Sequence, residues 1–556
     1  MERLLLFLFI FSCITTTSAQ QFSLRLAGTS DRETAIIDSI GYVSPVPNSK
    51  AAADEANAMT LKIQKAGYLS ATMREQPKPD DSTFLYRFGL GKKTEVIHIY
   101  TGKNSQLQKL GVLSAGKDTV TIPFADVEGF INRTLALLES KGYSLAKLKL
   151  INFDRDGDGL TAELYADTGT QRHLNDIVIS GYEKFPEGHK KNIARMYRNK
   201  TFNQETLNNL YDDFSKFRFV NQTKYPEILF TKDTTKVYVY LEKAKPNRFD
   251  GLIGFSNDAE QEKLVFTGYL DLMLVNIMNS GEELTLYWKS DGNEQKTFNA
   301  AIDLPYIFKT PFGLKAGLNI FKQDSTFQNT RTNIDLGYFF NYNTRLYLGY
   351  QATESSDIQN QNNFSINDYK NTFLTTNFIY TDYRPDDFLF PEKTRVSARI
   401  GAGKRDANLS TNNQLFAELN LGHNIYLNER NLFNIRSQNY YLKSDEYIIN
   451  ELYRFGGINS IRGFNENSLQ ANFLASLLTE YRHVPAPNIY VHSIIDYGYF
   501  RDESSANSGG LLGLGFGFGL LTKNGLLNLV YANGSTDEQS IRLSNSIVHI
   551  SFKATF

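Results

Sequence analysis

Apolar and polar residues alternate through the last part of the chain, and few folds are compatible with so long an alternation. From about Pro246 onward, segments of roughly ten residues alternate in polarity, with turn residues or polar loops between them. In "RVSARIGAG", for example, Val396 and Ile400 lie on one face, and Arg395 and Arg399 lie on the other. Successive side chains of a strand point to opposite faces, so the pattern predicts strands with one apolar face.

Two structures fit such strands: a half-buried sheet in a soluble protein, or the wall of a transmembrane barrel. The alternation continues for about 310 residues without a helical segment to cover a sheet, and it divides into about sixteen strands, an even number. In lipid an open edge would leave backbone groups unpaired, so the sheet must close. We therefore predict a sixteen-stranded antiparallel barrel over residues 246–556, closed by strand one (near 249–257) and strand sixteen (near 547–556).

Composition fits a barrel better than a bundle of membrane helices. Phe and Tyr together number 72, which supplies the aromatic girdles of a barrel. Apart from the N-terminus, no stretch approaches the roughly 20 apolar residues of a membrane-spanning helix. The formal net charge is −1. No global basic surface is available for nucleic acid, and we expect no such partner.

The N-terminal segment "MERLLLFLFIFSCITTTSAQ" has the pattern of a secretory signal peptide over residues 1–19. Cleavage before Cys13, as in a lipoprotein, is the alternative, although the apolar run ahead of Cys13 is short. Cys13 is the only cysteine, so the mature chain would have none, and thiolate metal sites are excluded. The seven histidines form no ligand-spaced pair, and we expect neither a metal nor a cofactor.

Residues 20–245 mix helix and strand signals in a repeating order. Two amphipathic helices end in similar sequences, "IQKAGYLSA" and "LESKGYSLA", whose glycines, Gly67 and Gly142, are 75 residues apart. A weaker third copy begins at Phe214. Repeats of this length predict an array of small domains. We expect three, over residues 20–95, 96–170 and 171–245, each with the order strand, two helices, two strands.

Connection lengths predict which side of the barrel each loop occupies. If the repeats lie in the periplasm, turns after even-numbered strands are periplasmic; "PEKT" (391–394), "NERN" (428–431), "PAPN" (485–488) and "TKNG" (522–525) are short, as expected. The longer connections lie on the outer side. The sixth of them, residues 444–472, is called loop six below and contains "GGINSIRGF".

Loop six carries one arginine that we expect to be held inside the barrel. Glu480 lies on predicted strand twelve and Asp496 on strand thirteen, both facing inward. A guanidinium can bond carboxylates in bidentate fashion, so Arg462 is a candidate latch between them. Gly456, Gly457 and Gly463 would allow the backbone to approach the wall. A solvated loop arginine is the alternative.

These residues resemble the BamA/TamA-like superfamily of outer-membrane insertases and translocators, also called bacterial surface antigen proteins. Its hallmark, Val or Ile followed by Arg-Gly-Phe or Arg-Gly-Tyr in the sixth outer loop, is matched by Ile461-Arg462-Gly463-Phe464. Asp496 and Gly498 match its strand-thirteen pattern, and Glu480 its strand-twelve glutamate. "FLFPEKTRV" resembles its periplasmic turn but lacks the usual glycine. The last strand resembles the signal that outer-membrane assembly machinery reads, through His549, Ile550, Phe552 and Phe556.

The resemblance implies polypeptide-transport-associated (POTRA) repeats in the periplasm, a barrel in the outer membrane of a Gram-negative bacterium, and insertion or export of client proteins through a seam between the first and last strands. Implied partners are unfolded outer-membrane proteins, which bind strand edges, outer-membrane lipid, and accessory lipoproteins or periplasmic chaperones. Three repeats favour a TamA-like or lineage-specific paralogue over the main assembly factor.

Two alternatives to protein insertion remain at this point. A passive pore or a transporter of solutes or lipids needs an open lumen, which an inward loop would partly block. An enzyme is not expected, because the sequence contains no nucleophile motif or phosphate-binding loop. "DRDGDGL" (154–160) resembles the start of a calcium loop, but Tyr165 stands where a bidentate Glu is needed; a tight turn is the simpler interpretation.

Overall fold

The structure is a computed structural model. It describes residues 22–77, 79–102, 105–114, 116–156, 159–258, 263–291, 295–359, 365–384, 387–407, 410–523, 525–542 and 546–555. The predicted signal peptide and Phe556 lie outside these ranges. The chain forms two compact units, one up to His173 with Thr201–Glu205, and one comprising Leu174–Lys200 and the residues after Glu205. Within the described residues, no helix is long and apolar enough to cross a membrane.

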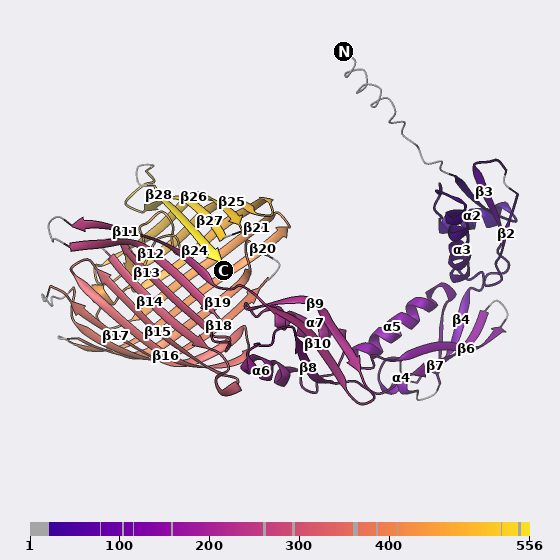
Figure 1. Cartoon of the computed structure of the whole chain (residues 1–556), viewed down its shortest axis with the longest axis horizontal. Helices are drawn as coiled ribbons and strands as arrows, with labels where there is room; N and C mark the ends of the chain where they lie inside the picture. Colours follow the sequence, from indigo (N-terminus) through magenta and orange to yellow (C-terminus); the bar gives the residue numbers. More distant parts are fainter. Residues whose placement is uncertain are drawn as a thin grey trace, which may run out of the picture. The chain divides into compact units, whose positions relative to one another are not determined.

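The first module has the predicted order of strand, two helices and two strands. Its sheet, ordered β1-β3-β2, is covered by the two helices (Figure 1). The apolar face predicted for the second helix, Ala52, Ala56, Met59 and Ile63, is fully buried. The elements are β1 (Ser23–Gly28), α2 (Asp31–Ile40), α3 (Ser49–Lys65), β2 (Thr72–Glu75) and β3 (Thr83–Gly89).

The second module departs from that order. Its first helix is only four residues long, and an added strand, β5, pairs with β4 at one edge of the sheet β5-β4-β7-β6. Gly111 and Gly116, both at positive φ, interrupt the segment where the helix was expected. The elements are β4 (Val96–Tyr100), α4 (Gln106–Lys109), β5 (Thr119–Pro123), η1 (Phe124–Asp126), α5 (Val127–Ser140), β6 (Lys147–Asp156) and β7 (Gly159–Asp167). The central residues of "DRDGDGL", 157–158, lie outside the described ranges.

The third module returns to the β-α-α-β-β order and, except for Thr201–Glu205, belongs to the second unit. Its sheet is ordered β8-β10-β9, with β8 and β10 parallel. Leu207, Leu210 and Phe214 follow a helical spacing and form the buried face of α7. The elements are β8 (Leu174–Ser180), α6 (Glu187–Tyr197), α7 (Gln204–Ser215), β9 (Val220–Phe230) and β10 (Thr235–Lys243).

The predicted sixteen-stranded antiparallel barrel is confirmed, and consecutive strands pair around it (Figure 1). The strands are β11 (Arg248–Asp258), β12 (Lys263–Val275), β13 (Glu283–Asp291), β14 (Gln295–Leu304), β15 (Phe312–Gln323), β16 (Phe327–Asn341), β17 (Thr344–Asp357), β18 (Tyr369–Tyr383), β19 (Glu392–Ala407), β20 (Thr411–Asn428), β21 (Asn431–Lys443), β24 (Phe473–Ala486), β25 (Ile489–Asp502), β26 (Asn507–Thr522), β27 (Gly525–Thr536) and β28 (Ile547–Thr555).

Burial along the strands is the reverse of that in a soluble sheet. On β18, Leu374 is 74% exposed whereas its polar neighbour Thr375 is 4% exposed. Asn377 on β18 and Gln414 on β20 are also buried, while Phe516 on β26 is exposed. An apolar exterior and a polar interior are what lipid requires of a barrel, which decides against the half-buried soluble sheet.

The parity prediction holds only in part. Two-residue turns follow β16, β20, β24 and β26, and the longest connection, loop six, follows an odd-numbered strand. The connections after β12, β14 and β18 have seven or eight residues, however, and those after β15, β19 and β25 have three or four. One prediction is misplaced: Glu392 to Thr394 of "PEKT" already belong to β19, so that turn lies before Glu392. Two hydrogen bonds stabilise this turn. The backbone N–H of Phe390 donates to the Asp387 carboxylate, and the backbone N–H of Arg384 donates to the carbonyl of Pro391.

The third module is packed against the short turns of the barrel. His189 of α6 is fully buried and lies edge-on to Phe217 and Phe219, at ring-centroid distances of 5.1 Å each, and to Tyr306 of a barrel turn at 4.8 Å. The amide of Asn192 donates to the carbonyl of Thr310 at 3.0 Å. Helix α6 and the turn around η2 (Ile307–Lys309) therefore form one continuous apolar joint.

Candidate functional site

Loop six folds back into the barrel rather than extending into solvent. After β21 it forms η3 (Ile449–Glu451) and then β22 (Tyr453–Phe455), which pairs with β23 (Leu469–Ala471) as a small ladder. We call residues 449–455 and 469–471 the base of the loop and residues 456–468 its tip. Ile461 and Arg462, in the tip, are almost completely buried.

Arg462 bonds both predicted carboxylates. Its Nε donates to Asp496 Oδ2 at 2.8 Å, and its Nη2 to Asp496 Oδ1 at 2.6 Å, which is a bidentate arrangement. The backbone N–H of Arg462 donates to the same Oδ2 at 3.0 Å. Its Nη1 donates to Glu480 Oε1. Asp496 lies on β25 and Glu480 on β24, so one guanidinium joins the tip to two adjacent strands.

Glu480 has additional cationic partners on the wall. Arg482 of β24 bonds its Oε2, from Nε at 2.7 Å and from Nη2 at 2.6 Å. Arg436 of β21 lies 3.8 Å from Oε1, and His492 of β25 lies 3.6 Å from Oε2. The Glu480 carboxylate therefore has several basic side chains around it. Among the described residues, the charged partner of Asp496 is Arg462.

The glycines of the motif lie where a side chain would not fit. Gly463 has φ +89°, and a Cβ there would lie 2.3 Å from the backbone of Asn533 on β27. Gly456 and Gly457 have φ of +99° and +100°, values that favour glycine, and they bend the chain at the start of the tip. A Cβ on Gly498 would lie 2.3 Å from Ile461 Cδ1. These contacts explain why small residues are needed on both the loop and the wall.

The remaining predicted site residues fall into two groups. Phe464 packs in the same apolar cluster as Ile461, and its ring lies beside Gly534 of β27. On β28, Ile550 and Phe552 are exposed and face outward, but His549 faces the interior and lines a cavity. His549 is therefore not on the face of its apolar neighbours. Phe556 lies outside the described residues.

The sequence analysis missed a row of glycines on β26. Gly513, Gly515, Gly517 and Gly519 share the inward face of the strand. A Cβ on Gly513 would lie 2.3 Å from the carbonyl oxygen of Arg462, and one on Gly517 would lie 2.1 Å from the ring of His492. The run "GLGFGFG", with glycine at every second position, was the available signal. At Gly513 the absence of a side chain leaves room for the backbone of Arg462 against the inner wall.

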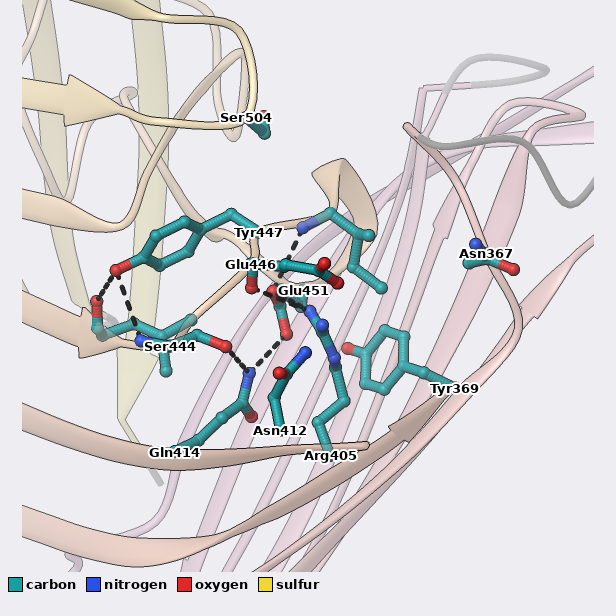
Figure 2. Close-up of polar contacts among 12 residues, drawn as sticks. Asn367, Tyr369, Arg405, Asn412, Gln414, Ser444, Glu446, Tyr447, Glu451 and Ser504 are labelled. Carbon is teal, nitrogen blue, oxygen red and sulfur yellow. Dashed lines mark hydrogen bonds and ion pairs between the residues drawn. The ribbon is translucent and has the colours of Figure 1, made fainter. Parts of the chain in front are cut away.

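The sequence analysis also missed two further attachments of loop six. Glu451 in the base pairs with Arg405 of β19, and both side chains are 1% exposed (Figure 2). Glu466 in the tip receives bonds from Lys289 at 2.6 Å and Tyr287 at 3.1 Å, both on β13. Loop six is therefore bonded to three separate parts of the wall. These pairings join residues far apart in sequence, and no local pattern indicated them.

The seam between the first and last strands is short. Among the described residues, strand β11 pairs with β28 through two residue pairs, Arg248 with Thr555 and Phe249 with Ala554. By contrast, β11 and β12 share eleven pairs, and β27 and β28 share eight. Much of the facing edge of both strands is therefore not joined across the seam by a regular ladder. Tyr269 of β12 bonds Asp250 of β11 at 2.7 Å on the inner side of this edge.

A cavity of about 580 Å³ lies between the tip of loop six and the inner wall near the seam. Arg462, Glu466 and Glu480 line it on one side, and Asp250 and His549 on the other. Within the part of the chain that the structure describes, no cluster of three His, Cys, Asp or Glu residues has the geometry of a metal site. The cavity is therefore lined by charged and polar side chains.

The sequence matches no protein-family model, and no curated protein matches it. Solved structures do match in fold. CdiB from Acinetobacter baumannii superposes with a TM-score of 0.52 and 15% identity, over 83% of this chain and 89% of that one. CdiB from Escherichia coli gives 0.50 and 12%, over 94% and 98%. BamA from Haemophilus ducreyi lacking POTRA domains 1-3 gives 0.46 and 15%, over 82% and 99%. The chain thus shares the fold of CdiB along most of its length.

Proposed function

We propose that this chain is an outer-membrane protein translocase or insertase of the BamA/TamA type, which handles client proteins at the seam between its first and last strands. The proposal places the barrel in the outer membrane of a Gram-negative bacterium and the three modules in the periplasm. It involves no covalent chemistry. Its support is the fold shared with CdiB and, above all, the two-residue seam.

The seam supports the proposal because a strand edge is a template for another strand. Opening the β11–β28 contact breaks two residue pairs, whereas opening β11–β12 breaks eleven. The freed backbone groups can then pair with a strand of a client, as in β-augmentation. Each pairing of a client strand replaces backbone hydrogen bonds that lipid cannot supply.

Loop six gives the rest of the barrel a fixed geometry while the seam moves. The Arg462 contacts lie on β24 and β25, away from β11 and β28. They hold the tip against β24 and β25, whereas Glu466 of the tip bonds Lys289 and Tyr287 of β13, on the other side of the seam. Motion at the seam therefore strains the β13 contacts and leaves the Arg462 contacts in place. On this proposal the latch maintains the shape of the barrel and does not itself contact the client.

The test is a reversible cross-link across the seam. Phe249→Cys combined with Ala554→Cys places thiols on directly paired residues, whose Cα atoms in such pairs are about 4.5–5.5 Å apart, within disulfide range. The variant is expressed in cells depleted of the natural protein. We expect oxidation to stop the assembly or export of client proteins there, and a reductant to restore it. Outer-membrane proteomics measures the set of clients that is lost.

The matched control is Leu272→Cys with Leu286→Cys, a directly paired position on β12 and β13. This cross-link staples two strands that are already joined by a long ladder, and client assembly should be unchanged. Normal assembly with an oxidised seam would exclude passage or insertion there. An unchanged outer-membrane proteome after depletion would favour a passive pore or a solute or lipid transporter instead.

A further inference from the structure

The turn that joins β18 to β19 folds into the lumen of the barrel. Phe390 in this turn is 8% exposed, whereas Phe388, two residues earlier, is 77% exposed. The ring of Phe390 lies edge-on to that of Tyr490 on β25, and the two ring centroids are 4.9 Å apart. We call residues 387–391 the Phe390 turn.

The contact between Phe390 and Tyr490 joins two distant parts of the wall. Four strand-to-strand steps separate β19 from β25 in the closed barrel. At about 4.8 Å per step, the two strands are about 19 Å apart along the wall, which is farther than two aromatic side chains can span. The backbone of the Phe390 turn must therefore leave the wall, and it carries the Phe390 ring into the lumen.

Hydrogen bonds and apolar packing hold the Phe390 turn in this position. The Asp387 carboxylate accepts from the backbone N–H of Phe390 at 2.8 Å and from the hydroxyl of Tyr426 on β20 at 2.7 Å. Phe390 also belongs to an apolar cluster with Leu432 of β21 and Leu526 of β27. The turn is thus fixed against the inner side of several strands.

Arg482 connects the Phe390 turn to the latch of loop six. Its guanidinium carbon lies 4.4 Å from the centroid of the Phe390 ring, which is a cation–π arrangement. The same guanidinium donates to Glu480, which also accepts from Arg462. A turn at one end of the barrel and a loop from the other end therefore meet inside the lumen.

The Phe390 turn lies at the end of the barrel that contacts the third module. Tyr383, the last residue of β18, packs under Arg218 of that module, whose guanidinium carbon is 4.7 Å from the ring centroid. The cavity of about 580 Å³ is lined by Phe390 as well as by Ile458 and Arg462 of the tip. Loop six and the Phe390 turn thus border the same space, and each enters it from a different end of the barrel.

We propose that the Phe390 turn is a second restriction of the lumen, which limits the passage of ions and small solutes at the module end of the barrel. An unobstructed barrel of sixteen strands encloses an aqueous channel. Loop six reduces the open cross-section from the outer side, and the Phe390 turn reduces it from the module end. That this end faces the periplasm rests on the proposed function, whereas the restriction itself does not.

The test is the ion conductance of the full-length protein in a planar bilayer. Two restrictions in series add their resistances, so the effect of one is largest when the other has been removed. Substitutions at Phe390 are therefore made with the natural loop six and in a chain whose tip, residues 456–468, is replaced by a two-residue turn. In the tip-replaced chain we expect Phe390→Ala to raise the conductance about twofold, and with the natural loop we expect a smaller increase.

Phe388 provides the matched control, because it is the same residue type in the same turn and is exposed. Phe388→Ala should leave the conductance unchanged in both chains. The substitutions Phe390→Leu, Phe390→Val and Phe390→Ala should raise it in that order, as the side chain becomes smaller. The series keeps the test valid if Phe390→Ala does not fold, since conductance is compared only between barrels with the gel mobility of the folded protein.

Equal conductance of the Phe390 and Phe388 variants in the tip-replaced chain would overturn the proposal. The measurement involves neither a client nor opening of the seam. A negative result here would therefore leave the proposed function intact, and a negative result of the seam cross-link would leave the second restriction intact.

Discussion

Arg462 illustrates how one residue can join two strands and a loop. Its guanidinium forms a bidentate pair with Asp496 and reaches Glu480, and its backbone N–H bonds Asp496 as well. Because all three side chains are buried, losing a contact leaves a charge unpaired in the protein interior, where it is poorly solvated.

Arg462→Ala should destabilise the barrel by about 3–5 kcal/mol, because Asp496 is left buried without its cation. Arg462→Lys should cost less but should not restore full stability, since an ammonium cannot form the bidentate pair. The measurement is the temperature at which the folded barrel loses its characteristic gel mobility. Equal stability of all three proteins would show that the latch adds nothing to the fold.

His189 makes the joint between the third module and the barrel sensitive to acid. Burial, with a smaller contribution from Arg345, lowers the pKa of His189 from 6.5 to about 3. The folded state therefore excludes a proton that the unfolded chain binds, and stability is lost as pH falls below 6.5. The loss is about 1.4 kcal/mol per pH unit. Thermal unfolding followed between about pH 7 and pH 5 should show it.

His189→Leu is the control for this pH dependence, since leucine is uncharged, fits an apolar site and cannot titrate. Its unfolding temperature should change less between the two pH values than that of the natural protein. If both proteins lose the same stability on acidification, other groups are responsible and the joint is not the sensitive element.

At the scale of elements, strand β26 is shaped by what it must accommodate. Four of its inward positions are glycine, and the backbone of Arg462 and the rings of His492 and Tyr490 occupy the space that side chains would fill. Glycine weakens a strand interior, so its repeated use here has a local reason. The neighbouring outward positions remain apolar and face lipid, as Phe516 does.

Gly513→Ala should displace loop six, because the new Cβ would lie 2.3 Å from the carbonyl oxygen of Arg462 and both are backbone-fixed. We expect a loss of about 1–3 kcal/mol, the usual range for overpacking. Gly422→Ala on β20 is the matched control, since its Cβ would meet nothing closer than 3.8 Å. A Gly513→Ala protein as stable as the control would mean that the loop can shift freely.

In the whole molecule, loop six crosses the lumen of a barrel whose first and last strands share two residue pairs among the described residues. The loop is bonded to β13, to β16 through β20, and to β24 and β25. An unobstructed barrel of this size would conduct ions, whereas a loop fixed at several points partly fills it. Loop six thus fills part of the lumen, and the seam has a much shorter ladder than the neighbouring strand pairs.

Replacing the tip, residues 456–468, by a two-residue turn between Phe455 and Leu469 should raise ion conductance severalfold, because these two residues are directly paired and can be closed by a hairpin. Conductance across a planar bilayer measures the effect. The natural protein should conduct weakly. High conductance of the natural protein, unchanged by the replacement, would favour a passive pore.

The amino-acid sequence alone determined the strands, their number, the closure of the barrel and the residues of the latch. Each of these depends on local information: polarity with period two, glycine at a bend, and charges at inward positions of successive strands. It failed for the second module, where the expected helix is short and an extra strand forms. It also left the pairing of Arg462 with Glu480 and Asp496 as one of two alternatives.

Contacts that join distant parts of the chain could not be predicted from local patterns and became visible in the folded barrel. Glu451 pairs with Arg405, 46 positions away, and Glu466 with Lys289, 177 positions away. The pairing register between the first and last strands sets the length of the seam. The inward path of loop six determines at which wall positions a side chain would collide with the loop. Such contacts follow from the curvature of a closed sheet, which brings strands far apart in sequence to opposite sides of one narrow space.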